Sequence, residues 1–240
     1  MELLVTKNYD DMSDKACDLL VERIKKNPNI VLGLATGSTP VGLYERLIKE
    51  YEKGELDFSN VVTFNLDEYL GLSEGHPQSY RYFMNDVLFD HINIDKNNTN
   101  FPRINEDGTI DKLEYEDRIK KAGGVDLQIL GVGSNGHIAF NEPAENLNLY
   151  TDIVDLTEST IEDNSRFFDK KEDVPTKAVS MGIGTIFQAK ELLVLANGKA
   201  KREAIDKVLN GGIISTNWPI TLVNLHHNVT LIIDEETYGK

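Results

Sequence analysis

The sequence predicts an α/β fold with an open, mostly parallel sheet and helices on both faces. Short β-branched and leucine-rich runs alternate with amphipathic stretches from one end of the 240-residue chain to the other. Apolar runs without polar interruptions are typical of parallel strands that helices cover on both faces. No linker rich in proline, glycine or serine and no internal repeat breaks the pattern, so we expect a single α/β domain over residues 1–240.

Five strands and six helices account for most of this pattern. The expected strands are Ile30–Ala35, Val61–Leu66, Asp126–Gly131, Glu191–Ala196 and Val229–Ile233. The expected helices lie at about Asp11–Lys26, Val41–Lys53, Gln78–Phe89, Asp111–Ala122, Lys199–Asn210 and Thr216–Leu225. Residues 158–175 are charged, weakly periodic and end at a proline, which indicates a surface segment and a candidate lid.

Composition and charge exclude several classes of protein. The chain carries a net charge of −15, so it lacks the basic footprint that a nucleic-acid surface needs. No run of about 18 apolar residues is present, which argues against a membrane span, and the first residues do not resemble a secretory signal. Cys17 is the only cysteine, so no internal disulfide can form, and we expect a soluble cytoplasmic protein.

The first loop with candidate chemistry is Thr36-Gly37-Ser38-Thr39-Pro40, between an expected strand and an expected helix. Open parallel sheets bind ligands beyond the carboxyl ends of their strands, where this loop begins. Gly37 permits close backbone approach, and the neighbouring hydroxyls with the helix N-terminus supply donors for an anion. The alternative is an ordinary helix cap and turn. No lysine completes a P-loop, which argues against a nucleoside triphosphate.

The second loop places two adjacent carboxylates, Asp67 and Glu68, at the end of an apolar strand. Such a position is costly unless the carboxylates cap a helix, bind a metal or take part in acid–base chemistry. Taken alone, a structural cap is as good an interpretation as catalysis. Neighbouring residues point apart in a strand, so only one of the two needs to face a cleft, and we favour Asp67.

The third loop runs from Gly131 to Pro143 and opens with a G-x-G-x-x-G pattern. A dinucleotide site is not indicated, because no long helical pattern follows and Pro143 interrupts the segment. The glycines instead deliver His137 to the end of a strand, with Glu142 five residues on. A histidine with a carboxylate partner is suited to proton transfer, although a buried histidine satisfied by a neighbour is the alternative.

The remaining histidines give no recognised metal-binding spacing. His226 and His227 are adjacent rather than four apart on a helix, and His76 and His91 lie in polar loop or helix-end surroundings. We therefore expect no metal site and treat these four side chains as non-catalytic.

Five stretches taken together resemble the glucosamine-6-phosphate deaminase family, also described as the glucosamine/galactosamine-6-phosphate isomerases. The most specific part of the resemblance is the string from Gly136 to Pro143, within the third stretch. The five stretches are Leu34–Pro40, Phe64–Tyr69, Gly131–Pro143, Asn164–Phe168 and Asn197–Ala200. The resemblance covers nearly the whole chain, in order, and implies a modified Rossmann-like fold. It also implies conversion of glucosamine 6-phosphate to fructose 6-phosphate and ammonia, with no cofactor.

The resemblance implies a role for each matching residue. Asp67 matches the general base that moves a proton between C2 and C1 of the open-chain sugar. His137 matches the group that opens the sugar ring, and Glu142 matches its carboxylate partner. Gly131 belongs to the glycine-rich loop that can offer backbone donors to the enediolate oxygen.

The resemblance also implies phosphate ligands, which a protein of net charge −15 needs if its substrate is an anion. Arg166 and Lys199 match these ligands, alongside the loop of Thr36, Gly37, Ser38 and Thr39. An arginine, a lysine and a helix N-terminus suffice for a phosphate site, because surface charges beyond about 8 Å are screened at physiological salt. Taken alone, both side chains are more simply solvated surface cations.

Two departures from the family pattern stand out. Asn135 occupies a position where many members carry aspartate, so an Asp–His–Glu relay is impossible and Asn135 can only orient the imidazole. Residues 145–152 contain no arginine or lysine, whereas the longer hexameric members carry basic allosteric residues there. We therefore expect the shorter, non-allosteric type, as a monomer or small homo-oligomer.

Two rival functions remain at this point. A hydrolase similar to 6-phosphogluconolactonase would share the fold, the phosphate loop and the Gly-His element, but would need no base at the second strand end. A non-catalytic sugar-phosphate sensor would keep Arg166 and Lys199 and could dispense with Asp67, His137 and Glu142. The presence of all three favours an enzyme acting on an amino sugar phosphate.

Overall fold

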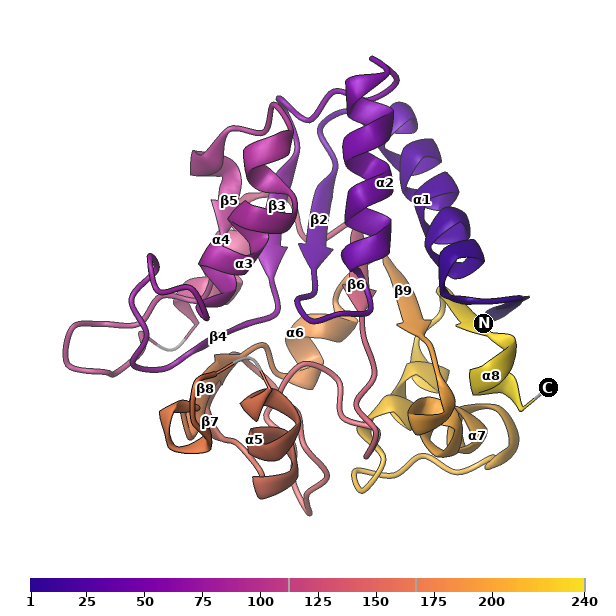
Figure 1. The fold of residues 1–240 in the computed structure, drawn as a ribbon. Helices are drawn as coiled ribbons and strands as arrows, with labels where there is room; N and C mark the ends of the chain where they lie inside the picture. Colours follow the sequence, from indigo (N-terminus) through magenta and orange to yellow (C-terminus); the bar gives the residue numbers. More distant parts are fainter. Residues whose placement is uncertain (112, 167, 240) are drawn as a thin grey trace.

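The computed structural model describes residues 1–111, 113–166 and 168–239 and contains a large parallel sheet with a smaller sheet beside it (Figure 1). The strands are β1 (Glu2–Thr6), β2 (Val31–Leu34), β3 (Val62–Asn65), β4 (Asp67–Tyr69), β5 (Thr99–Asn100), β6 (Leu127–Leu130), β7 (Asp152–Asp155), β8 (Lys177–Ser180), β9 (Glu191–Ala196) and β10 (Val229–Asp234). The helices are α1 (Tyr9–Lys26), α2 (Val41–Glu52), α3 (Tyr80–Val87), α4 (Glu114–Lys121), α5 (Glu158–Ser165), α6 (Ile183–Phe187), α7 (Arg202–Asn210) and α8 (Glu235–Tyr238). Short 3₁₀ helices are η1 (Phe89–His91), η2 (Lys96–Asn98), η3 (Lys171–Asp173), η4 (Lys199–Lys201) and η5 (Pro219–Leu225).

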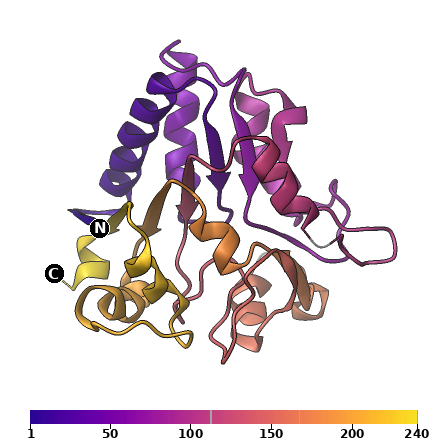
Figure 2. The ribbon, with the colours of Figure 1, turned by 180° about the vertical axis from the view of Figure 1, so that it is seen from behind.

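The large sheet has seven strands in the order β1-β10-β9-β6-β2-β3-β5, and each of its strand pairings is parallel. Helices α1 and α2 lie side by side on one face, and α4 lies on the other (Figures 1 and 2). The predicted fold class is therefore confirmed. Because all strands run the same way, the loops after β2, β3 and β6 meet at one edge of the sheet.

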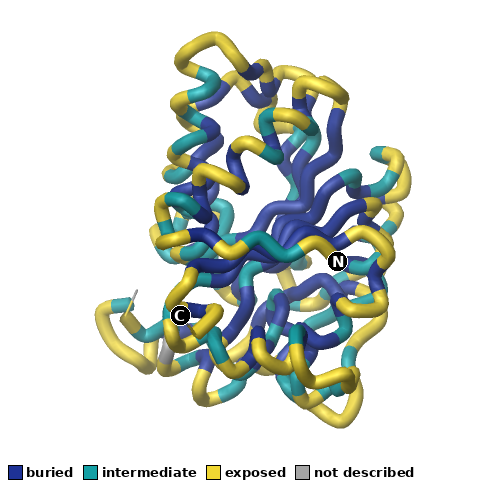
Figure 3. Tube along the Cα trace, turned by 90° about the vertical axis from the view of Figure 1, so that its right-hand side faces the viewer, coloured by how far each residue is buried: buried dark blue, intermediate teal, exposed yellow. Residues whose placement is uncertain are grey.

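Burial explains why these segments form strands and helices. The central strands β2, β6, β9 and β10 are buried along their whole length, and the Cα trace in Figure 3 is dark blue through the sheet. Helix α1 buries one stripe at four-residue spacing, formed by Met12, Ala16, Leu20 and Ile24. Asn8 caps this helix by accepting a hydrogen bond from the Asp11 backbone N–H.

The smaller sheet joins β4, β8 and β7 in antiparallel pairing and lies beyond the carboxyl edge of the large sheet (Figure 1). Only Leu66 separates β3 of the large sheet from β4 of the small one. Helix α5 and the 3₁₀ helix η3 fall within the candidate lid, whose residue Phe167 lies outside the described residues. The site residues therefore stand where the two sheets meet.

Several expected helices differ from the structure in type or in where they begin. Residues 216–225 form the 3₁₀ helix η5 only from Pro219, because the residue before a proline is pushed out of the α region and Trp218 has φ −140° and ψ 74°. The helix expected at Lys199–Asn210 begins as η4, and α7 proper starts at Arg202. The helix expected at Asp111–Ala122 is α4 from Glu114; Lys112 is outside the described residues.

Several elements give no periodic signal in the sequence, among them β1, β4, β5, β7 and β8. Strand β1 is an edge strand with exposed and partly buried residues, and the others are only two to four residues long. Within the described part of the chain, no helix is long and apolar enough to cross a membrane.

Candidate active site

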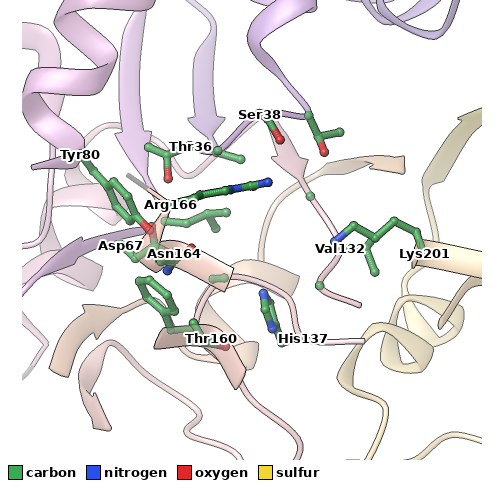
Figure 4. Close-up of a pocket in the computed structure, with 18 residues that line it drawn as sticks. Thr36, Ser38, Asp67, Tyr80, Val132, His137, Thr160, Asn164, Arg166 and Lys201 are labelled. Carbon is green, nitrogen blue, oxygen red and sulfur yellow. The ribbon is translucent and has the colours of Figure 1, made fainter. Parts of the chain in front are cut away.

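A cleft with a volume of about 180 Å³ opens at the carboxyl ends of β2, β3 and β6. Three loops and helix α5 form its walls, so the strand ends that carry the predicted motifs converge there (Figure 4). The lining residues are Ala35, Thr36, Gly37, Ser38, Thr39, Leu66, Asp67, Tyr80, Gly131, Val132, Gly133, His137, Ala139, Phe140, Thr160, Asn164, Arg166 and Lys201.

The loop after β2 presents backbone and hydroxyl groups to this cleft. Gly37 has φ +89°, a conformation that glycine adopts without strain, and it turns the chain into helix α2. The loop is fixed from behind, because the Tyr9 hydroxyl donates to the Ser38 carbonyl at 3.0 Å and accepts from the Gly42 N–H at 2.8 Å. The Thr39 hydroxyl donates to Asn197 Oδ1 at 3.1 Å, which ties this loop to the end of β9.

Two cations line the cleft, and one of them differs from the expected residue. Arg166 and Lys201 point into the cleft from opposite sides in Figure 4. Lys199 does not line it; its Nζ lies 3.9 Å from a Glu236 carboxylate oxygen and its side chain is 77% exposed. The two lysines lie two residues apart, and Lys201 stands immediately before helix α7, so only the position of the helix start separates them.

The adjacent carboxylates Asp67 and Glu68 point in different directions and have different surroundings. Glu68 is buried and accepts hydrogen bonds from the backbone N–H groups of Tyr69, Tyr80 and Arg81 at 2.8–2.9 Å. It therefore caps the start of helix α3, as the structural interpretation of this pair required. Asp67 instead lines the cleft, so the structural interpretation of the motif fits Glu68 alone.

Asp67 is buried but has few partners. It is 6% exposed, and within the described residues its carboxylate accepts no hydrogen bond from a side chain or backbone group. Burial, with a smaller contribution from the negative charge of Glu68, raises the pKa of Asp67 to about 8. A carboxyl group with a raised pKa in a cleft is suited to taking and returning a proton near neutral pH.

Aromatic side chains form the wall behind Asp67. Tyr80 stacks on Phe140 with ring centroids 6.1 Å apart and an interplanar angle of 12°, and it lies against Tyr69 at 4.7 Å. Asn164 of helix α5 donates to the Tyr69 hydroxyl at 2.9 Å. Figure 4 shows Tyr80 beside Asp67. These rings keep water away from the carboxyl group, which is the physical source of its raised pKa.

Glycines shape the loop that carries His137. A Cβ on Gly133 would lie 2.3 Å from Nδ1 of His137, so only glycine leaves room for the imidazole. Gly136 has φ +82°, and a Cβ there would lie 2.7 Å from Cε3 of Trp218. The loop closes on itself through an antiparallel bridge between Ile138 and Asn141. The pattern that resembled a dinucleotide motif therefore serves to position one histidine.

His137 and Glu142 form a close pair. His137 Nδ1 lies 3.3 Å from Oε2 of Glu142, and the imidazole lines the cleft while the carboxylate lies behind it. Asn135 Nδ2 donates to the same oxygen at 2.8 Å, and the Thr160 hydroxyl donates to the other oxygen, Oε1. Burial opposes ionisation, but His137 together with the Thr160 and Asn135 donors outweighs it and lowers the pKa of Glu142 to about 2.

Asn135 reaches the imidazole only indirectly. Its Oδ1 accepts from the His137 backbone N–H at 3.2 Å, and its Nδ2 binds Glu142. Asn135 can therefore orient the His137 ring only by holding the Glu142 carboxylate that lies beside it. Thr160 was not among the predicted site residues; it comes from the weakly periodic segment, 18 residues from Glu142 in the sequence.

The other histidines lie away from this cleft. His226 is buried, with its ring nitrogens next to the carbonyls of Asn228 and Ala189. His91 contacts the Asp86 carbonyl, and His76 accepts from the Gln78 N–H. Across residues 1–111, 113–166 and 168–239, no group of three or more His, Cys, Asp or Glu side chains could hold a metal ion.

The strand-end cleft combines a donor loop, two cations and two carboxyl groups with opposite pKa shifts, which suits an enzyme that binds an anion and transfers protons. Residues 7–232 match the family model described as glucosamine-6-phosphate isomerases/6-phosphogluconolactonase, and the chain belongs to this family.

Within this family, the chain is more similar to the deaminases than to the lactonase given below. The chain is 55% identical to a glucosamine-6-phosphate deaminase of Clostridium perfringens, covering 98% of each chain. It is similar to the solved structure of a monomeric glucosamine-6-phosphate deaminase, with a TM-score of 0.93 and 41% identity over 100% of this chain and 99% of the other. A 6-phosphogluconolactonase from Trypanosoma cruzi shares the fold, with a TM-score of 0.76 and 20% identity over 100% and 96% of the two chains.

Proposed function

We propose that this enzyme deaminates glucosamine 6-phosphate, producing fructose 6-phosphate and ammonia with one molecule of water consumed. The observation that carries the proposal is the pairing of a buried, weakly partnered carboxyl group, Asp67, with the His137–Glu142 pair across one cleft. Relatives with this name that share 50–55% identity over at least 98% of the chain support it. The reaction is a hydrolysis in overall stoichiometry, and its central step is an aldose–ketose isomerisation.

In this proposal, His137 and Glu142 carry out the opening of the sugar ring. The imidazole takes the proton of the anomeric hydroxyl and returns a proton to the ring oxygen as the bond between C1 and that oxygen breaks. Glu142 stabilises the imidazolium that forms between these transfers, because its carboxylate lies 3.3 Å from Nδ1. The product of this step is the open-chain aldehyde.

Asp67 then acts as the base of the isomerisation. It removes the proton from C2 of the aldehyde while O1 gains a proton, giving an enol that carries the amine on C2, and it returns the C2 proton to C1. The amine nitrogen loses a proton as it becomes an imine, water adds to the imine carbon, and the resulting carbinolamine expels ammonia. Gly131 belongs to the glycine-rich loop at the end of β6, whose backbone N–H groups are suited to stabilise the intermediate's oxygen.

The phosphate group is assigned to the opposite end of the cleft. Thr36, Gly37, Ser38 and Thr39 supply donors, and Arg166 supplies a cation. In place of Lys199, we assign the second cation to Lys201, because Lys201 lines the cleft and Lys199 does not. Two cations in the cleft suit an anionic substrate in spite of the net charge of −15.

The two lysines provide a matched test of this assignment. We expect Lys201→Ala to raise the KM for glucosamine 6-phosphate by about 10–100-fold, the loss of a charge-assisted contact. Lys199→Ala should change the KM by less than about twofold, since an exposed ion pair contributes little. Steady-state kinetics of the two variants shows which lysine binds the phosphate. A larger rise in KM for Lys199→Ala than for Lys201→Ala would reverse the assignment.

The reaction itself is tested by product analysis with a chelator present. Wild-type protein should form ammonia and fructose 6-phosphate from glucosamine 6-phosphate in equal amounts. Absence of both products from folded protein would overturn the proposal. Hydrolysis of 6-phosphogluconolactone, or binding of the sugar phosphate without turnover, would then indicate the lactonase or the sensor.

The remaining assignments concern assembly and location. We propose a cytoplasmic monomer or small homo-oligomer that binds neither nucleic acid nor membrane. The similarity to a monomeric deaminase supports the proposed assembly. The single, unpaired cysteine supports the cytoplasmic location, and the net charge of −15 argues against nucleic-acid binding. Residues 145–152 lack basic side chains, so N-acetylglucosamine 6-phosphate should leave the substrate curve unchanged.

A further inference from the structure

Helix α5 contacts two different parts of the proposed catalytic machinery. Thr160, in its first turn, donates a hydrogen bond to Glu142, and Asn164, one turn later, donates to the Tyr69 hydroxyl at 2.9 Å. Arg166 follows the helix and lines the cleft. One eight-residue helix therefore links the carboxylate behind His137, the aromatic wall beside Asp67 and the proposed phosphate end.

Thr160 is placed to control the Glu142 carboxylate. Its side chain is buried, with the residue 4% exposed, and its hydroxyl accepts from the Thr157 hydroxyl at 3.2 Å while donating to Oε1 of Glu142. The other oxygen, Oε2, receives the Asn135 amide and faces His137. Each carboxylate oxygen thus has its own donor, which fixes the rotation of the carboxylate plane.

The departure at Asn135 makes this control more important. An amide carries no charge, so Glu142 alone supplies the negative charge that stabilises the imidazolium. A carboxylate held from one side only could turn its oxygens away from Nδ1, and proton transfer is sensitive to small misplacements of the groups involved.

We infer that Thr160 is a positioning residue for ring opening, whose hydroxyl holds the Glu142 carboxylate in the orientation that pairs with His137. The inference rests on the proposed deaminase function. Because Thr160 and Arg166 belong to one segment, it also means that the alignment of His137 and Glu142 depends on α5 being seated on the cleft.

Three variants of α5 test the inference. Thr160→Val keeps the shape but removes the hydroxyl, and we expect kcat for glucosamine 6-phosphate to fall by about 10–100-fold, with KM within about threefold. Thr160→Ser keeps the donor and should stay within about threefold of the wild-type kcat. Ser159→Ala removes an exposed hydroxyl from the same turn and should match the wild type.

A second readout separates positioning from a merely structural role. 2-Amino-2-deoxyglucitol 6-phosphate, the sugar reduced at C1, has no ring to open, so Thr160→Val should bind it with wild-type affinity. An equal loss of kcat in Thr160→Val and Thr160→Ser, or a loss of analogue affinity matching the loss of kcat, would overturn the positioning role. Wild-type kcat in Thr160→Val would also overturn it while leaving the deaminase intact. No deamination by the wild type would overturn the proposed function itself.

Discussion

The two sides of the cleft carry buried carboxyl groups whose pKa values are shifted in opposite directions. Asp67 is 6% exposed and has its pKa raised to about 8, whereas Glu142 is 8% exposed and has its pKa lowered to about 2. The solvent-exposed fraction is therefore almost the same at both residues. What differs is the number of donors: Glu142 has Asn135, His137 and Thr160 around it, and Asp67 has the negative Glu68 as its neighbour.

The comparison shows how one cleft can hold two carboxyl groups with different roles. A carboxylate surrounded by donors stays charged and serves as a fixed counter-ion, while one against aromatic rings can gain and lose a proton near neutral pH. Substitutions that neutralise the two carboxyl groups should therefore have different effects on activity and on stability.

Removing the proton acceptor should abolish most of the activity. We expect Asp67→Asn to lower kcat by about 10²–10⁴-fold, the usual contribution of a positioned general base. Ammonia release from glucosamine 6-phosphate, measured at saturating substrate, gives this number. Circular dichroism of the variant provides the control for folding, and a well-folded variant with wild-type kcat would remove Asp67 from the proposed role.

Removing the counter-ion should cost less. Glu142→Gln leaves His137 in place but without a negative charge beside Nδ1, and we expect kcat to fall by about 10–100-fold. Steady-state assays of ammonia release at saturating substrate measure this change in kcat. A greater loss in Glu142→Gln than in Asp67→Asn would mean that ring opening, not the C2-to-C1 proton transfer, depends most on its carboxyl group.

The raised pKa of Asp67 predicts the acid side of the pH profile. In the free enzyme the carboxyl group is protonated below about pH 8 and must be ionised to act as a base, so kcat/KM should rise by about tenfold per pH unit up to that point and then level off. The profile of kcat/KM from about pH 5 to 9 tests this, since it reports groups of the free enzyme. A plateau that already begins near pH 5 would show that Asp67 titrates normally.

The two neutralising substitutions should change stability in opposite directions. The folded state raises the pKa of Asp67 from 3.8 to about 8, so folding loses stability as pH rises through that interval, and Asp67→Asn should stabilise by about 1–3 kcal/mol above about pH 8. Folding lowers the pKa of Glu142 from 4.5 to about 2. Its ionised carboxylate therefore stabilises the folded state above about pH 4.5, and this stabilisation is lost as the pH falls towards 2. Glu142→Gln should therefore destabilise by about 1–3 kcal/mol at neutral pH.

Urea unfolding at several pH values measures both changes. The Asp67→Asn gain should vanish below about pH 4, and the Glu142→Gln loss should shrink towards about pH 2. Changes of the same sign in both variants would contradict the explanation by hydrogen-bond donors.

The sequence was sufficient to predict the large sheet apart from its two edge strands, β1 and β5, and much of the cleft. Fully buried parallel strands produce uninterrupted apolar runs, and the loops that follow them meet at one edge by geometry alone. The placement of Asp67 and His137 in one cleft follows from that rule. The assignment of chemical roles to those residues came from the family resemblance rather than from the pattern.

The small sheet and the contacts of α5 could not be predicted in this way. Strand β4 has three residues, and it pairs with β8 more than a hundred residues later, which leaves no local period to detect. Thr160 reaches Glu142 from helix α5, whose Ile161 packs against a cluster that includes Tyr69 and Ala178 of the small sheet. The choice between Lys199 and Lys201 depends on where a helix begins, and helix boundaries are the weakest part of any pattern analysis.

The contact between Gly136 and Trp218 gives the protein a built-in optical probe. Trp218 is the only tryptophan in the chain, and its ring lies against the residue that precedes His137. Lys207 lies over the same ring, with Nζ 5.4 Å from its centroid. Any movement of the histidine loop changes the packing around this single indole, so its emission should follow substrate binding in real time without an attached label.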